Sequence, residues 1–74
     1  MNIFRINTTA NEEEDFFLMT NLNEQDIVEV ITPIVNAERD GSETYTNDEL
    51  LQALHRRYPS DMIVMYYHFD VISI

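Results

Sequence analysis

The residue types that most often carry out catalysis are few in this sequence. Cysteine is absent, and Ser42, Ser60 and Ser73 lie outside any Gly-x-Ser-x-Gly turn that would expose a nucleophile. The two histidines, His55 and His68, fall at an expected helix end and on an expected strand, where structural roles are ordinary. A single glycine and the absence of lysine exclude a phosphate-binding loop. We therefore expect that the protein is not an enzyme.

Two short patterns in the sequence partly resemble metal sites. His68 and Asp70 would project to the same side of a strand, but a stable site needs more than two ligands. Residues 40–43 (DGSE) resemble an oxygen-rich calcium loop, yet they lack its alternating acids and its closing glutamate. Paired carboxylates for acid–base catalysis need a cleft that shifts their pKa values, and 74 residues leave little room for one. The sequence predicts no metal and no cofactor.

Negative charge is the most unusual property of the chain. Fourteen acidic residues face four arginines, and the formal net charge is −10. The whole excess lies in residues 1–49, because acids and arginines are equal in number in residues 50–74. A charge of this size repels nucleic acid and anionic membranes and attracts basic surfaces. The alternative is that the acidity only keeps a small protein soluble.

A run of four acids, Glu12 to Asp15, is the densest part of this charge. Extended residues advance by about 3.3 Å each, and one strand of B-DNA carries a phosphate about every 3.4 Å. An extended run would therefore approach the charge density of a nucleic-acid strand, although the run could equally be a solvated loop that protects a sheet edge. The predicted partner-binding residues are Glu12, Glu13, Glu14, Asp15, Asp26, Glu29, Asp48 and Glu49.

In size and acidity the chain is similar to small inhibitors that bacteriophages and mobile elements encode against restriction, repair or CRISPR enzymes. Those inhibitors share no common motif, so the similarity is one of type. It implies an inhibitor or modulator that acts as a DNA mimic. Its partner would be the basic surface of a nucleic-acid-handling protein, and it would not bind nucleic acid directly.

Composition also bears on location. Small secreted domains usually rely on disulfides, and this chain has no cysteine. The first fifteen residues lack the apolar stretch of a signal peptide, and no run approaches the roughly 20 apolar residues that span a bilayer. We expect one cytoplasmic domain over residues 1–74, with no membrane association.

Hydrophobic periodicity predicts five elements. Asn2–Thr8 alternates as a strand, and Asp15–Thr20 is a short strand that is apolar on both faces. Met62–Ile74 alternates as the longest strand, with Ile63, Met65, Tyr67, Phe69 and Val71 on its core face. A first helix begins after Asn23 and ends near Asp40-Gly41, and Pro33 inside it should kink it or split it in two. Its apolar stripe consists of Ile27, Val30, Ile31, Ile34 and Ala37, widened by Val28 and Val35. The pattern Thr46-x-x-Glu49 caps a second helix, which Pro59 stops.

The order β-β-α-α-β predicts a small two-layer α+β domain, in which a three-stranded, mainly antiparallel sheet carries two helices on one face. The other sheet face is then left open. This gives a second interpretation of function, a structural or accessory protein that forms a homodimer through that face. The residues expected there are Ile3, Phe17, Met19, Val64, Tyr66 and Ile72.

Overall fold

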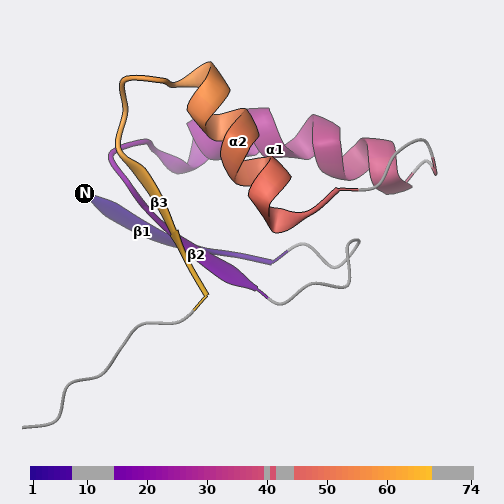
Figure 1. The fold of residues 1–74 in the computed structure, drawn as a ribbon, viewed down its shortest axis with the longest axis horizontal. Coiled ribbons are helices and arrows are strands. Elements are labelled where there is room, and N and C mark those ends of the chain that lie inside the picture. The colour runs from indigo at the N-terminus through magenta and orange to yellow at the C-terminus, as the bar shows by residue number, and fades with distance from the viewer. Residues whose placement is uncertain (8–14, 40, 42–44, 68–74) are drawn as a thin grey trace, which may run out of the picture.

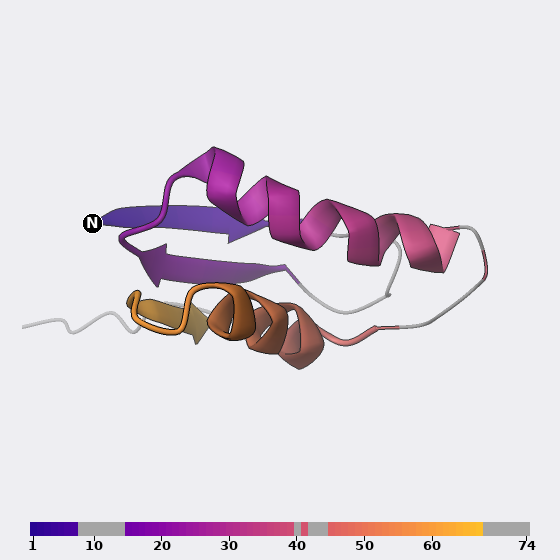
Figure 2. The same ribbon diagram turned by 90° about the horizontal axis from the view of Figure 1, so that it is seen from above.

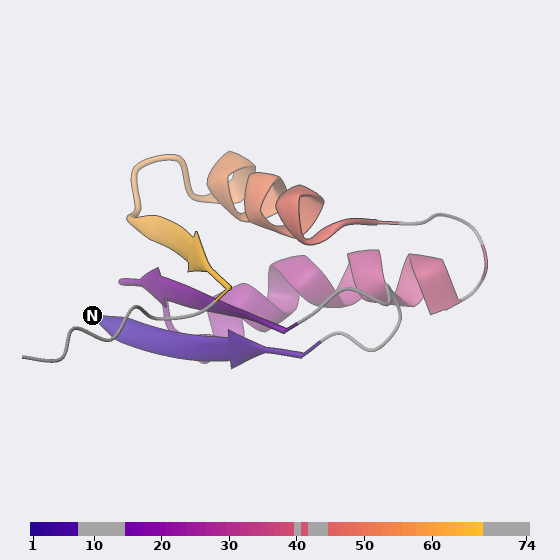
Figure 3. The same ribbon diagram turned by 60° about the horizontal axis from the view of Figure 1, so that its bottom comes forward.

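The computed structural model describes residues 1–7, 15–39, 41 and 45–67. Its elements are the strands β1 (Asn2–Ile6), β2 (Phe16–Thr20) and β3 (Ile63–Tyr66) and the helices α1 (Glu24–Arg39) and α2 (Asn47–Arg57). The strands form one antiparallel sheet in the order β1-β2-β3. Both helices lie on the same side of it (Figure 1), and Figure 3 views the sheet from the other side, with the helices behind. The predicted two-layer β-β-α-α-β fold is confirmed.

The central strand β2 determines which residues face the helices. Phe16, Leu18 and Thr20 are fully buried, whereas the alternate residues Phe17 and Met19 are only half-buried. This alternation follows from the period of two along a strand, with the helices covering one sheet face only. The buried polar residue Thr20 accepts a hydrogen bond at its Oγ1 from the backbone N–H of Leu22, 3.1 Å away. That bond holds the turn from β2 into α1.

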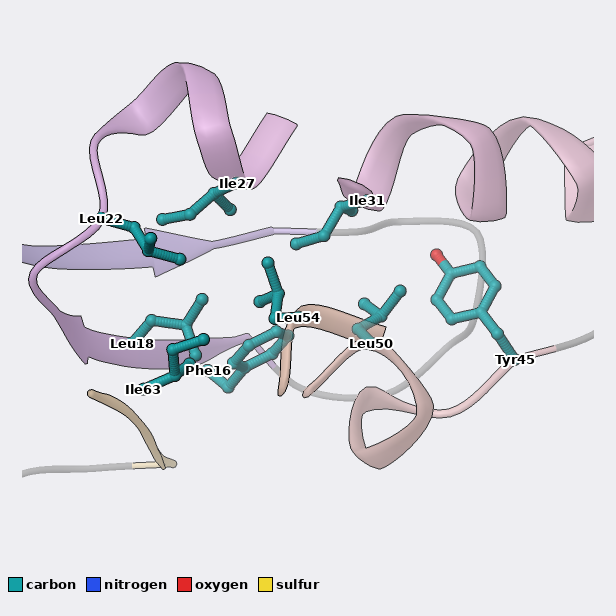
Figure 4. Packing of buried hydrophobic residues seen from close by; sticks show 9 residues of the cluster. All are labelled: Phe16, Leu18, Leu22, Ile27, Ile31, Tyr45, Leu50, Leu54 and Ile63. Carbon is teal, nitrogen blue, oxygen red and sulfur yellow. The ribbon is translucent and has the colours of Figure 1, made fainter. Parts of the chain in front are cut away.

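The core is formed between β2 and the two helices (Figure 4). Leu50 and Leu54 of α2 are fully buried, and Ile27 and Ile31 of α1 face them across the core. Seen from above, α1 runs along the β1 side of the sheet and α2 along the β3 side (Figure 2). The buried hydrophobic residues are Phe16, Leu18, Leu22, Ile27, Ile31, Tyr45, Leu50, Leu54 and Ile63.

The first helix starts with a reciprocal cap. The backbone N–H of Asp26 donates to Asn23 Oδ1 at 2.9 Å, and the N–H of Asn23 donates to Asp26 Oδ2 at 3.3 Å. Pro33 was predicted to kink or split this helix, but α1 continues through it as one helix. Pro33 and Glu29 are both exposed, so water can bond the Glu29 carbonyl that the proline leaves without a donor.

The second helix begins and ends as predicted. Thr46 Oγ1 accepts from the N–H of Glu49 at 3.2 Å, and Thr46 has the extended backbone of an N-cap. Tyr58 closes the helix by donating its N–H to the Leu54 carbonyl at 2.9 Å, directly before Pro59.

Strand lengths were overpredicted. β1 ends at Ile6 and β2 starts at Phe16. β3 ends at Tyr66, and Tyr67, which was expected on the core face, is 39% exposed. Tyr66 pairs with Phe17, so Phe16 is the one residue of β2 that remains beyond this pair. A last strand as long as the predicted one therefore has no room beside β2. The rest of the predicted last strand, residues 68–74, lies outside the described residues.

Truncation of Leu54 should strongly destabilise the fold. Leu54→Ala opens a cavity at the centre of the core, and we expect a loss of about 3 kcal/mol in the free energy of unfolding. Leu51→Ala makes the same change on the same helix at a half-buried position and should cost clearly less. Urea denaturation followed by circular dichroism measures both. Equal losses would contradict a core centred on Leu54.

Candidate binding surfaces

The predicted acidic residues on the helices lie near the helix starts. Asp26 and Glu29 lie in the first turns of α1 together with Glu24, which was not predicted as a binding residue, and we call these three residues the α1 acidic cluster. Asp48 and Glu49 lie in the first turn of α2. Carboxylates at these positions interact favourably with the positive end of a helix dipole. Both groups therefore stabilise the helices that carry them.

The run Glu12–Asp15 is described only at its last residue, because Glu12, Glu13 and Glu14 lie outside the described residues. Asp15 forms an ion pair with Arg5, whose Nη2 and Nε lie 2.6 and 3.0 Å from Asp15 Oδ2. Asn7 also donates to the same oxygen at 3.4 Å. Asp15 is thus partly neutralised across the β1–β2 pair, and its charge is less open to a partner than the sequence suggested.

A polar link joins the α1 acidic cluster to the end of α2. The Tyr58 hydroxyl donates to Asp26 Oδ1 at 3.4 Å, and the Arg57 guanidinium lies 4.9 Å from the centre of the Tyr58 ring. Desolvation raises the pKa of Tyr58 above its usual value, and the negative charges of Asp26 and Glu29 raise it further, while Arg57 opposes them. Asp26 and Glu29 therefore act on the same small region.

The two acidic groups do not form one continuous array. Tyr58 places the C-terminal end of α2 beside Asp26, so the eleven residues of α2 separate Asp48 and Glu49 from the α1 cluster. At 1.5 Å per residue this separation is about 15 Å, roughly twice the Debye length of about 8 Å at physiological salt. The structure thus brings Asp26 and Glu29 together and places Asp48 and Glu49 apart.

The open sheet face carries apolar side chains, as predicted. Ile3, Met19 and Val64 lie side by side in one row across the three strands, and Ile3 and Val64 are 58% and 37% exposed. Phe17 and Tyr66 lie in the next row, beside Arg5. Ile72, the last residue predicted for this face, lies outside the described residues.

A second apolar surface, which was not predicted, lies between β1 and α1. It is a groove of about 360 Å³, and we call it the β1–α1 groove. The helical pattern placed Val28 at the margin of the core stripe, but Val28 lines this groove and is 50% exposed. It is exposed because α1 overhangs the β1 side of the sheet (Figure 2). The signal in the sequence was an apolar arc on α1 wider than one core face requires. The lining residues are Phe4, Arg5, Ile6, Asn7, Glu24, Ile27, Val28, Ile31, Thr32, Val35 and Asn36.

No metal-binding arrangement accompanies these surfaces in the part of the chain that the structure describes. His55 is exposed in the last turn of α2, and no three potential metal ligands gather among the described residues. His68 and Asp70, and all but Gly41 of residues 40–43, lie outside them. Neither described helix has the length and apolar character needed to cross a membrane.

The pKa of Tyr58 gives the protein an alkaline limit. The neutral phenol stabilises the folded state fully below about pH 10, the pKa of an exposed tyrosine, and this stability is lost as pH rises through the higher folded pKa. We expect the free energy of unfolding to fall above pH 10 less steeply in Tyr58→Phe than in the wild type. Urea denaturation at a series of alkaline pH values tests this, and identical slopes for the two proteins would refute it.

Comparison with known proteins identifies no family for this chain: no protein-family model, no curated protein and no solved structure matches it.

Proposed function

We propose that the protein is a binding module without enzymatic activity, which inhibits or modulates a partner by engaging a basic protein surface. The observation that carries this proposal is the α1 acidic cluster. Glu24 and Glu29 are exposed, Asp26 is half-buried, and no basic side chain occurs among residues 24–37 of the same helix. Because the whole chain carries a net charge of −10, long-range attraction steers it toward basic partners.

The partner that best suits this charge is a cytoplasmic nucleic-acid-handling protein. Such proteins present arginine and lysine side chains to phosphate groups, and a competing array of carboxylates can occupy the same surface. The chain would then act as a DNA mimic, as do the small bacteriophage inhibitors of restriction or CRISPR enzymes. Asp61, which lies between α2 and β3, adds a carboxylate near the N-terminal end of α1. It accepts a hydrogen bond from Asn21, just before α1, at 2.7 Å.

Two double variants separate the cluster from the overall charge. Glu24→Gln/Glu29→Gln and Asp48→Asn/Glu49→Gln each remove two acids near a helix start, so their net charges are equal. We expect the first to weaken partner binding about five-fold, as two exposed ion pairs of about 0.5 kcal/mol each would predict, and the second to weaken it less.

The measurement is capture from bacterial lysate at salt concentrations from about 0.05 to about 0.5 M, followed by competition of each captured protein with its nucleic acid. Salt-sensitive capture of nucleic-acid-binding proteins, reduced mainly by the α1 variant, supports the proposal. Equal capture by both variants would mean that net charge alone attracts the partner. Partners retained at high salt would contradict a basic interface.

The open sheet face favours a second candidate function, that of a structural or accessory protein which acts as a homodimer. The row formed by Ile3, Met19 and Val64 is apolar on all three strands, and pairing two such faces would enlarge a thin core. Two chains of charge −10 repel one another, so a dimer of this kind should become stronger as salt screens the repulsion.

Sedimentation equilibrium at low and high salt tests the dimer. We expect Ile3→Gln to raise its dissociation constant about ten-fold, because the variant removes an apolar side chain from the shared face. Val28→Gln changes a residue of similar exposure on the helical side and should leave the constant unchanged. A monomer at every salt concentration would exclude this candidate.

A further inference from the structure

The open sheet face has no cover from the two helices. Both helices lie on the opposite side of the sheet (Figure 3). Met1 and Ile3 are 74% and 58% exposed, the two largest exposed fractions among the described large hydrophobic residues. The side chain of Ile3 lies on the open face, and alternation along the chain places Met1 on the same face. The most exposed apolar side chains of the described residues therefore gather on this face, along β1.

The side chains of β1 give this surface a definite order. Counted toward the start of the chain, every second residue is Arg5, then Ile3, then Met1, and we call these three residues the β1 row. The Arg5 side chain is 67% exposed although it pairs with Asp15. A guanidinium has five N–H donors, so it can bind a second carboxylate beside Asp15. A matching occupant brings one carboxylate and then two apolar side chains, spaced two residues apart.

Residues 68–74 (HFDVISI), which lie outside the described residues, have this order. Every second residue from Asp70 onward is Asp70, then Ile72, then Ile74. In an extended segment these three side chains point to the same side. A segment antiparallel to β1 meets the β1 row from its charged end, so Asp70 faces Arg5. The two isoleucines then face the two apolar members of the row.

We propose that residues 68–74 fold back over the open sheet face, antiparallel to β1, with Asp70 bound to Arg5. A cover of this kind buries the apolar part of the β1 row, and burial of apolar surface is favourable. The inference concerns the sheet face and does not rest on the function proposed for the α1 acidic cluster.

The length of the chain supports this path. Tyr66 lies beside Phe17, and Phe17 lies beside Arg5, so the chain leaves β3 at the level of Arg5. β1 and β3 are two strand spacings of about 4.8 Å apart, which is about 10 Å. The three residues that follow Tyr67 and end at Asp70 span the same distance, at about 3.3 Å each. The four residues after Asp70 reach about 13 Å further, which is enough to run back along β1.

Charge and tethering favour this occupant over a second copy of the chain. Two chains of charge −10 repel one another, whereas residues 68–74 carry a single acid, which Arg5 attracts. A short tether gives the segment an effective concentration of about millimolar at the face. An exposed ion pair alone contributes little, so burial of the two isoleucines supplies most of the affinity. The docked segment also excludes the sheet-face dimer considered above, because both need the same surface.

A spin label on the segment tests the proposal in the full chain. The chain has no cysteine, so Ser73→Cys gives a single attachment site, on the side of the segment that points away from the sheet. Paramagnetic broadening of backbone amide signals in NMR spectra shows which residues lie near the label. We expect the strongest broadening in β1, at Asn2 and Ile3, weaker broadening in β3 and the least in α2.

Two pairs of variants, made in the labelled protein, test the contacts. Asp70→Asn should shift the docking equilibrium about three-fold toward the undocked form, whereas Asp48→Asn removes the same charge from α2 and should change little. Ile72→Gln should shift the equilibrium about ten-fold, as loss of one buried isoleucine contact predicts. Its neighbour Val71 points the other way, so Val71→Gln should change little. The broadening in β1 measures each shift.

Three results would overturn the inference. Broadening that is strongest in β3 would place the segment along the outer edge of that strand. Absence of broadening in β1 would leave the face uncovered. Broadening between spin-labelled chains and separate isotope-enriched chains in a mixture would assign the contact to a second copy. None of these results touches the proposed function, because capture through the α1 acidic cluster is measured separately.

Discussion

Burial of the central strand is the constraint on which the rest of this structure depends. Phe16 and Leu18 are fully covered by the two helices, and Leu50 and Leu54 of α2 are buried to the same degree. Two helices over three strands can cover the middle of a sheet without covering both margins. Here α2 lies over the β3 side and α1 overhangs the β1 side (Figure 2), and the helix-facing residues of β1, Phe4 and Ile6, stay half-buried. The groove is thus a consequence of how the core closes over β2.

The same packing divides the acidic residues by role. Asp15 is held by Arg5 and Asn7, and Asp26 caps α1 while accepting from Tyr58, so both carboxylates contribute to the fold. Glu24 is exposed, and Glu29 is exposed and accepts a hydrogen bond from Gln25 of its own helix. The net charge counted from a sequence overstates the negative charge that is available to a binding partner, because some carboxylates cap helices or form ion pairs within the fold. Among the described residues, the exposed carboxylates are Glu24 and Glu29 on α1 and Asp48 and Glu49 on α2.

Local rules predicted the elements, and packing decided their limits. The caps at Asn23 and Thr46, the stop at Pro59 and the two faces of β2 follow from residue types and spacing alone. Strand ends did not follow, because β2 has only one residue beyond the pair of Phe17 with Tyr66 and cannot carry a partner strand as long as the one predicted. Tyr45, just before the Thr46 cap, was missed as a core residue, although it and Leu50 occupy the positions of a hydrophobic staple.

The groove could not be placed from the sequence, because Val28 lies at the edge of the apolar arc of α1 and only the packing of α1 against the sheet decides whether such a residue is buried or exposed. The same packing leaves Phe4 and Ile6 half-buried, so the domain lacks part of the apolar burial that a fully covered β1 would supply. A chain of this length has a free energy of unfolding of roughly 4 to 11 kcal/mol, and a core that closes on only one side of the sheet keeps it in that range.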